Sequence, residues 1–195
     1  MSFENLKSQI LNLKSINNEC FSSLFLTAVL ALFSGVYNQG KFARYIGILG
    51  LLVALCVSFS PELAFFNQYK SMFDFNENAA LFTKISLVVT LLIFFLVGFA
   101  FNNHRSHQSE LYSLMLFSLI GAVILFSFTN LVTLFLGIEI LSIPLYVMAG
   151  SNKTDLRSNE ASIKYFLMGA FATGFLLFGI ALIYGSTGSF DVHVI

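Results

Sequence analysis

Long apolar runs separated by short polar segments dominate the pattern of this sequence. An apolar run of about twenty residues forms a helix of about 30 Å, which matches the hydrocarbon core of a bilayer. The pattern predicts six transmembrane helices, at about residues 21–37, 45–60, 81–101, 111–128, 131–150 and 161–185. The chain is therefore expected to be an all-α polytopic membrane protein, with a group of four helices over residues 21–128 and two more after it.

The polar segments between these runs differ in length and character. Residues 1–20 form a polar amino-terminal tail. Residues 61–80 form an amphipathic connection with several aromatic side chains, which we expect at the membrane surface. Residues 129–130 form a very short reversal, and residues 151–160 form a polar loop in which Ser158 is a candidate cap for the last helix. A short polar tail is expected after the last helix.

Basic residues gather in the loops on one side of the six predicted helices. They are Lys41, Arg44, Arg105, Lys153 and Arg157. The opposite side holds the acidic connection 61–80 and an uncharged reversal. Because loops rich in lysine and arginine stay in the cytoplasm, we expect the basic loops there and the amino terminus outside.

Composition supports a membrane protein and argues against other classes. Hydrophobic residues make up 57% of the 195 residues and charged residues only 10%, with a mean hydropathy of +0.83. Soluble domains carry about 25% charged residues. The formal net charge is zero, which gives no electrostatic basis for binding nucleic acid. Cys20 and Cys56 lack the spacing of a metal or redox motif and are expected to pack as small apolar side chains.

Glu139 is the only acidic or basic side chain in the run 131–150. A charge at the centre of a bilayer costs at least about 2.5 kcal/mol, so an intramembrane carboxylate is predicted to have a function. Pro144 is expected to bend the helix because it lacks an N–H. Ser142 and Tyr146 place two hydroxyls on the same helical stripe as Glu139. These groups predict a proton site. The alternative is a neutral acid that only hydrogen-bonds to a neighbouring helix.

Glu160 and Lys164 form the second candidate site, at the start of the last helix. They lie four residues apart with the glutamate first, which is the favourable order for a helical ion pair. The pair could belong to a proton path. It could equally be an ion pair at a helix end, with the lysine side chain reaching back to the cytoplasmic surface.

Small residues four positions apart recur further along the last helix. The pairs are Gly169 with Thr173 and Ala170 with Gly174. Such pairs let another helix approach closely, so a crowded bundle is expected. The sequence contains no nucleotide fingerprint, no zinc motif and no nucleophile constellation, so neither a metal site nor a catalytic redox centre is predicted.

Two long motifs carry a resemblance to a known family. They are LVTLFLGIEILSIPLYVMAG at residues 131–150 and SNEASIKYFLMGAFATGFLLFGIALIYGSTGSF at residues 158–190. With them the chain resembles the antiporter-like subunits of proton-pumping NADH–quinone oxidoreductase (respiratory complex I), in particular the subunit N group. These are similar to subunits of multisubunit Na⁺/H⁺ antiporters. Residues 1–128 agree with the family in layout but have no equally sharp motif.

The resemblance implies roles for the candidate residues. Glu139 corresponds to a glutamate of the fifth helix that pairs with a lysine on a later helix. Glu160 and Lys164 correspond to acidic and basic residues of the proton path at the head of the sixth helix. Residues 129–195 would then begin the proton-translocating domain, with the fourth to sixth helices opening an antiporter-like repeat. Family members are longer and contain two inverted repeats, so the chain looks like an amino-terminal part.

The resemblance also implies cofactors, partners and location. The chain would bind no cofactor itself, whereas other subunits of the complex would use NADH, flavin, iron–sulfur clusters and quinone. Its partners would be other membrane subunits, including sister antiporter-like subunits, and the lipid bilayer of a bacterial inner membrane. Three alternatives stay open: a subunit of a cation/proton antiporter, a non-conducting structural subunit, and a truncated fragment.

Overall fold

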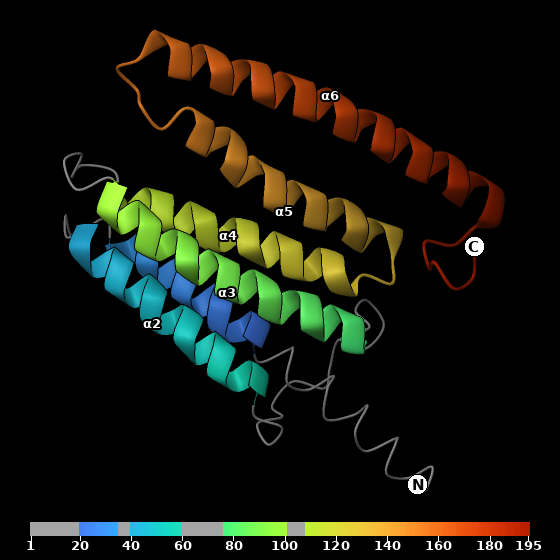
Figure 1. The fold of residues 1–195 in the computed structure, drawn as a ribbon. Coiled ribbons are helices and arrows are strands. Elements are labelled where there is room, and N and C mark those ends of the chain that lie inside the picture. Colours follow the sequence, from blue (N-terminus) through green and yellow to red (C-terminus); the bar gives the residue numbers. More distant parts are fainter. Residues whose placement is uncertain (1–19, 35–39, 60–75, 101–107) are drawn as a thin grey trace, which may run out of the picture.

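The computed structural model describes residues 20–34, 40–59, 76–100 and 108–195 (Figure 1). The predicted tail at residues 1–20 lies almost wholly outside these ranges. The same holds for most of the predicted amphipathic connection at residues 61–80.

The described residues are helical throughout, apart from short turns. The helices are Cys20–Ser34, α2 (Gly40–Phe59), α3 (Glu77–Ala100), α4 (Gln108–Ser127), α5 (Leu131–Ala149) and α6 (Leu156–Thr187). Among the described residues, α3 to α6 are long and apolar enough to cross a membrane. The predicted all-α membrane fold is confirmed.

The start of α6 differs from the prediction. The helix begins at Leu156 rather than near residue 161, because Asp155 and not Ser158 is its N-cap. The Asp155 carboxylate accepts a hydrogen bond from the backbone N–H of Arg157 at 3.0 Å. This bond satisfies one of the free N–H groups of the first turn. Residues 156–160 are therefore helical, and the Ser158 hydroxyl is available for another contact.

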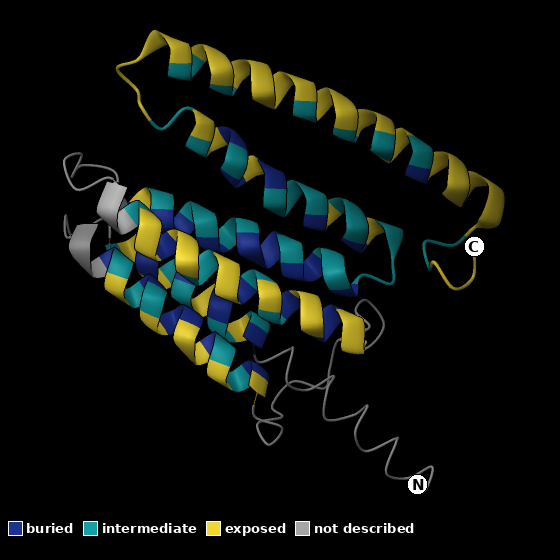
Figure 2. Ribbon diagram, viewed as in Figure 1, coloured by how far each residue is buried: buried dark blue, intermediate teal, exposed yellow. Residues whose placement is uncertain are grey.

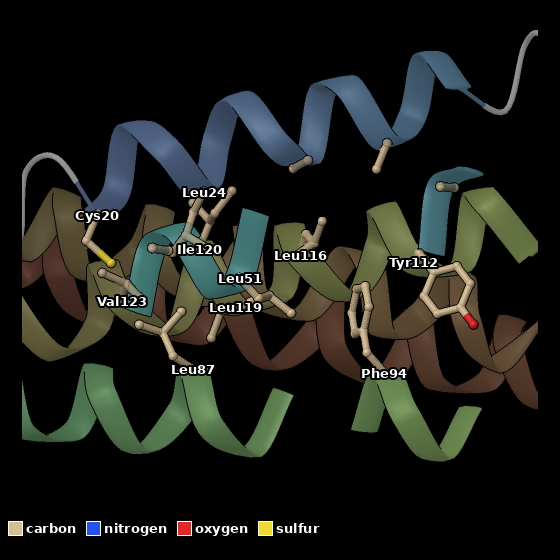
Figure 3. Packing of buried hydrophobic residues seen from close by; sticks show 14 of the residues in the cluster. Cys20, Leu24, Leu51, Leu87, Phe94, Tyr112, Leu116, Leu119, Ile120 and Val123 are labelled. Carbon is tan, nitrogen blue, oxygen red and sulfur yellow. The ribbon is translucent and has the colours of Figure 1, made fainter. Parts of the chain in front are cut away.

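The hydrophobic core lies in the bundle formed by Cys20–Ser34, α2, α3 and α4. Each of these helices contributes side chains to one buried cluster, as Figure 3 shows. Leu24, Leu51, Leu87 and Leu116 are all fully buried. In this cluster apolar side chains pack closely against one another. The packing holds α4 in the bundle, and α5 packs on α4.

Glycines bring α4 and α5 into backbone contact. A Cβ atom at Gly121 would lie 2.4 Å from the backbone nitrogen of Leu141. A Cβ atom at Gly137 would lie 2.9 Å from a methyl carbon of Leu125. Small residues on facing helices permit this close approach in membrane proteins. The position of α5 is thus set by α4 over the central part of both helices.

The last helix is the outermost layer of the described structure (Figure 1). Of helices α2 to α5, α6 contacts only α5. Figure 2 shows α6 exposed along most of its length, and Ile180 is its only buried residue. Phe171, for example, is 71% exposed. A wide apolar surface of α6 is therefore uncovered.

Candidate functional site

The buried residues of α5 fall on two stripes. Gly137 and Pro144 belong to the stripe that faces α4, since Gly137 meets Leu125 there. Ser142 and Tyr146 are buried on a second stripe, and Tyr146 contacts α6. At 3.6 residues per turn the two stripes lie on opposite sides of the helix. α5 is therefore packed between α4 and α6.

Glu139 lies at the edge of the stripe that faces α6. It is partly buried, and helical geometry places it close to the direction of Tyr146. On its other side lie Leu136 and Ile143, which are 50% and 49% exposed. The carboxylate thus stands where the α5–α6 contact ends and the uncovered apolar surface begins.

No described residue pairs with the Glu139 carboxylate, by hydrogen bond or by ion pair. Glutamate at a membrane-spanning position ordinarily faces an interior and finds a partner. The lysine partner implied by the family resemblance is not among the residues that the structure describes. The open edge beside Glu139 is the place where such a partner could approach.

Ser142 and Pro144 lie one turn beyond Glu139. The Ser142 hydroxyl donates a hydrogen bond to the carbonyl of Ile138 in the preceding turn. α5 continues through Pro144, which leaves the carbonyl of Ile140 without its usual backbone donor. Gly121 of α4 approaches the backbone at this point, since its Cβ would lie 2.8 Å from the Ile140 carbonyl carbon. The close packing of α4 therefore supports α5 where its hydrogen bonding is interrupted.

Tyr146 fills the space between α5 and α6. A Cβ atom at Gly169 would lie 2.0 Å from the Tyr146 hydroxyl oxygen and 2.4 Å from Cζ. The ring also meets the edges of Tyr165 and Phe166, with centroid separations of 4.7 and 5.9 Å. The close approach predicted at Gly169 is confirmed. The one predicted at Gly174 is not found, because nothing lies within 4 Å of its Cβ position.

The carboxyl end of α5 is held by serines of α6, and its last four carbonyls all have donors. Ser162 donates to the Tyr146 carbonyl at 3.0 Å, and Ser158 donates to the Ala149 carbonyl at 2.8 Å. The carbonyls between them accept from two backbone N–H groups of the following turn. Ser162 was not singled out from the sequence. Its spacing of four residues from Ser158, just after a short loop, is the signal that could have identified it.

The amino end of α5 is held by the segment after α6. Gly188 ends α6 in the left-handed conformation, with φ of 71°, and the chain then turns back. The Leu131 N–H donates to the Phe190 carbonyl at 2.9 Å, and the Val192 N–H donates to the Thr129 carbonyl at 3.0 Å. The polar tail predicted after α6 is therefore paired with the α4–α5 reversal.

Glu160 and Lys164 form an ion pair on α6, in the predicted order. The Lys164 and Glu160 side chains are 69% and 62% exposed. Glu160 precedes Gly169 by nine residues, or about two and a half turns, so it lies on the side of α6 opposite to the α5 contact. The structure thus places Glu139 beside α6 and the ion pair on the outer face of α6, and the two sites do not meet.

Other features of the described residues lie away from these sites. A groove of about 480 Å³ runs between α3, α4 and α5, with apolar side chains and the hydroxyls of Ser86, Thr90 and Ser118 in its lining. Glu139 is not in this lining. Within the described ranges, no three His, Cys, Asp or Glu side chains are placed to hold a metal ion together.

Residues 127–195 match the family described as NADH:quinone oxidoreductase/Mrp antiporter, transmembrane. The chain is 45% identical over 152 residues to NADH-quinone oxidoreductase subunit N of Cytophaga hutchinsonii. This alignment covers 77% of the chain and 32% of that protein. It is 40% identical over 167 residues to the NADH-quinone oxidoreductase subunit N of Flavobacterium psychrophilum, in an alignment that covers 86% of the chain and 37% of that protein.

Two solved structures share the fold of the chain. The chain superposes on a chain of respiratory complex I from Thermus thermophilus with a TM-score of 0.69 and 29% identity, covering 89% of the chain and 38% of the other. An archaeal membrane-bound sulfane sulfur reductase shares the fold, with a TM-score of 0.78 and 20% identity, covering 92% of the chain and 39% of the other. The chain spans about a third of the length of the curated relatives it matches. It belongs to the antiporter-like family that contains subunit N of the NADH–quinone oxidoreductases.

Proposed function

We propose that the chain is part of a proton-translocating membrane subunit of an NADH–quinone oxidoreductase, and that Glu139 takes up and releases the proton. One observation carries the proposal. Glu139 is a partly buried carboxylate on a helix long and apolar enough to span a membrane, on the same stripe as the buried residues Ser142 and Tyr146, and no described residue pairs with it. The named relatives supply the redox reaction to which this proton movement would be coupled.

The physical basis is the sensitivity of an intramembrane carboxylate to nearby charge. Desolvation favours the neutral acid, whereas a cation within a few ångströms favours the carboxylate. In the proposal, a cationic side chain of a further element approaches the open edge of α5 and keeps Glu139 ionised. Its withdrawal leaves Glu139 to take up a proton. Movement of one charge is thereby converted into uptake of one proton.

The Glu160–Lys164 pair has a secondary role in the proposal. It lies on the face of α6 that α5 does not cover, so further helices of a longer protein could pack against it. Lys164 could then leave Glu160 for another carboxylate, because exchange between two exposed partners involves little free energy. We place the basic loops with Lys153 and Arg157 in the cytoplasm of a bacterium, and the amino terminus outside its inner membrane.

The proposal assigns the electron transfer to other subunits. NADH, flavin, iron–sulfur clusters and quinone would bind there, and this chain would bind no cofactor. Its partners would be sister antiporter-like subunits and other membrane subunits. The uncovered apolar surface of α6 supports the packing of further helices against this chain, since large exposed apolar patches mark interaction sites or lipid contacts.

The test is Glu139→Gln in the full-length protein within its assembled complex. Glutamine keeps the shape and hydrogen bonding of the side chain but cannot carry the proton. We expect proton pumping by inside-out vesicles to fall by about 100-fold, the usual cost of losing a positioned proton-transfer group. Glu77→Gln, at an exposed helix start, is the matched control and should pump normally. Normal pumping by Glu139→Gln would favour a non-conducting structural subunit instead.

A second candidate function is cation/proton antiport, because the matched family includes the Mrp antiporters. The same vesicles separate the two. Proton movement that needs NADH and quinone and is indifferent to Na⁺ supports the oxidoreductase. Proton movement that follows an imposed Na⁺ gradient without NADH supports the antiporter.

A further inference from the structure

The Tyr146 hydroxyl has no described hydrogen-bond partner, although the residue as a whole is buried between α5 and α6. The residue is only 7% exposed, yet its hydroxyl makes no hydrogen bond to any residue that the structure describes. The hydroxyl of a tyrosine whose ring is buried usually finds a hydrogen-bond partner. The ring contacts with Tyr165 and Phe166 hold the side chain in place but offer the hydroxyl no acceptor.

The hydroxyl is directed along α6 toward the level of Glu139. The backbone carbonyl of Tyr146 is bonded to Ser162, whereas its hydroxyl lies against Gly169, seven residues or about 10 Å further along α6. α6 runs antiparallel to α5, so this direction leads toward the amino end of α5 (Figure 1). Glu139 lies seven residues, or about 10 Å, back along α5 in that same direction. Both side chains tilt toward the amino end of α5, and the longer tyrosine side chain reaches further along it.

Ser142 lies between the two groups on the same stripe. Its hydroxyl proton is used in the bond to the Ile138 carbonyl, so its oxygen is left as an acceptor. The order along the stripe is therefore a phenol donor, a hydroxyl acceptor and a carboxylate. A water molecule placed among them would have the two to four polar partners that a buried water needs.

We propose that the Tyr146 hydroxyl orders the water through which Glu139 exchanges its proton, and that Gly169 keeps the hydroxyl in place. The inference rests on the proposed function. In the exchange the carboxylate gains the proton that the ordered water molecule loses. That water molecule then takes up a proton from a second water molecule hydrogen-bonded to it. The phenol keeps its own proton and acts as a positioning residue. Water-mediated hydrogen bonds of this kind are nearly as favourable as direct ones.

The experiment compares Tyr146→Phe with Tyr165→Phe in the full-length protein of the assembled complex. Each variant removes one phenol oxygen from the same ring cluster, but only Tyr146 lies on the stripe of Glu139. Two quantities are measured: protons pumped per quinone reduced, and the rate at which a hydrophobic carbodiimide labels Glu139. A purely structural role of the ring is retained in phenylalanine and would alter neither.

We expect Tyr146→Phe to assemble normally and to lower both the pumping ratio and the labelling rate by about tenfold, at the low end of the effect of proton-transfer groups. Tyr165→Phe should match the unmodified protein. Normal pumping and labelling in Tyr146→Phe would overturn the inference, and so would failure of that variant to assemble. The proposed function fails separately, if Glu139→Gln pumps normally.

Discussion

The contact between Tyr146 and Gly169 predicts the effect of adding one methyl group to α6. Alanine at Gly169 would place Cβ at 2.0, 2.4 and 2.9 Å from three atoms of the Tyr146 side chain. All three distances are below van der Waals contact, so the ring or the helix must move. The ring is flanked by Tyr165 and Phe166, and hydrogen bonds from Ser162 and Ser158 hold the two helices together nearby.

Two opposing contributions set the change in the free energy of unfolding that Gly169→Ala causes. Glycine to alanine inside a helix gains about 1 kcal/mol of helix stability. Overpacking at a closed contact costs about 1–3 kcal/mol. Gly174→Ala, where nothing lies within 4 Å, should show the helix gain alone. We therefore expect Gly169→Ala to be less stable than Gly174→Ala by about 1–3 kcal/mol, the overpacking cost.

The assay is the free energy of unfolding of the detergent-solubilised protein, from titration with a denaturing detergent. A double-mutant cycle isolates the contact. In a Tyr146→Leu background the ring is gone, so Gly169→Ala should behave like Gly174→Ala within about 0.5 kcal/mol. Equal stability of the two alanine variants in the unmodified background would refute the close contact. So would a penalty that persists without the Tyr146 ring.

Two further predictions concern the middle and the amino end of α5. Relative to Gly174→Ala, Gly121→Ala should destabilise the protein by about 1–3 kcal/mol or more, at least as much as Gly169→Ala, because its Cβ meets the backbone of Leu141, which cannot rotate away. Asn130→Ala should cost about 1 kcal/mol, since the Asn130 side chain accepts the Val132 N–H at 2.8 Å as the N-cap. The same titration measures both, and Asn130→Asp, which keeps the cap, is the control for the second.

Hydrophobic pattern was sufficient to predict the helices, because a twenty-residue apolar run has few alternatives in a bilayer. It also made Glu139 a candidate, since a single carboxylate in such a run is conspicuous, and the role of that residue stays a prediction. It could not tell that Asp155 rather than Ser158 caps α6, because both residue types suit the position. Nor could it tell which side of α6 would meet α5. Beyond Lys164 this helix is mainly apolar on all sides, so there the packing of Tyr146 on Gly169, together with the Ser158 and Ser162 bonds in the preceding turns, distinguishes its faces.

The hydrogen bonds at the two ends of α5 have a mechanical consequence. Ser158 and Ser162 attach one end to α6, and the segment with Phe190 and Val192 attaches the other. Because α5 is hydrogen-bonded at both ends, it can neither slide along α6 nor rotate about its own axis without breaking some of these bonds. α5 and α6 should therefore move together as one rigid body. If Glu139 takes up the proton as proposed, a change elsewhere in a complex would then act on it through side chains that move at the open edge, and not through a lengthwise shift of α5.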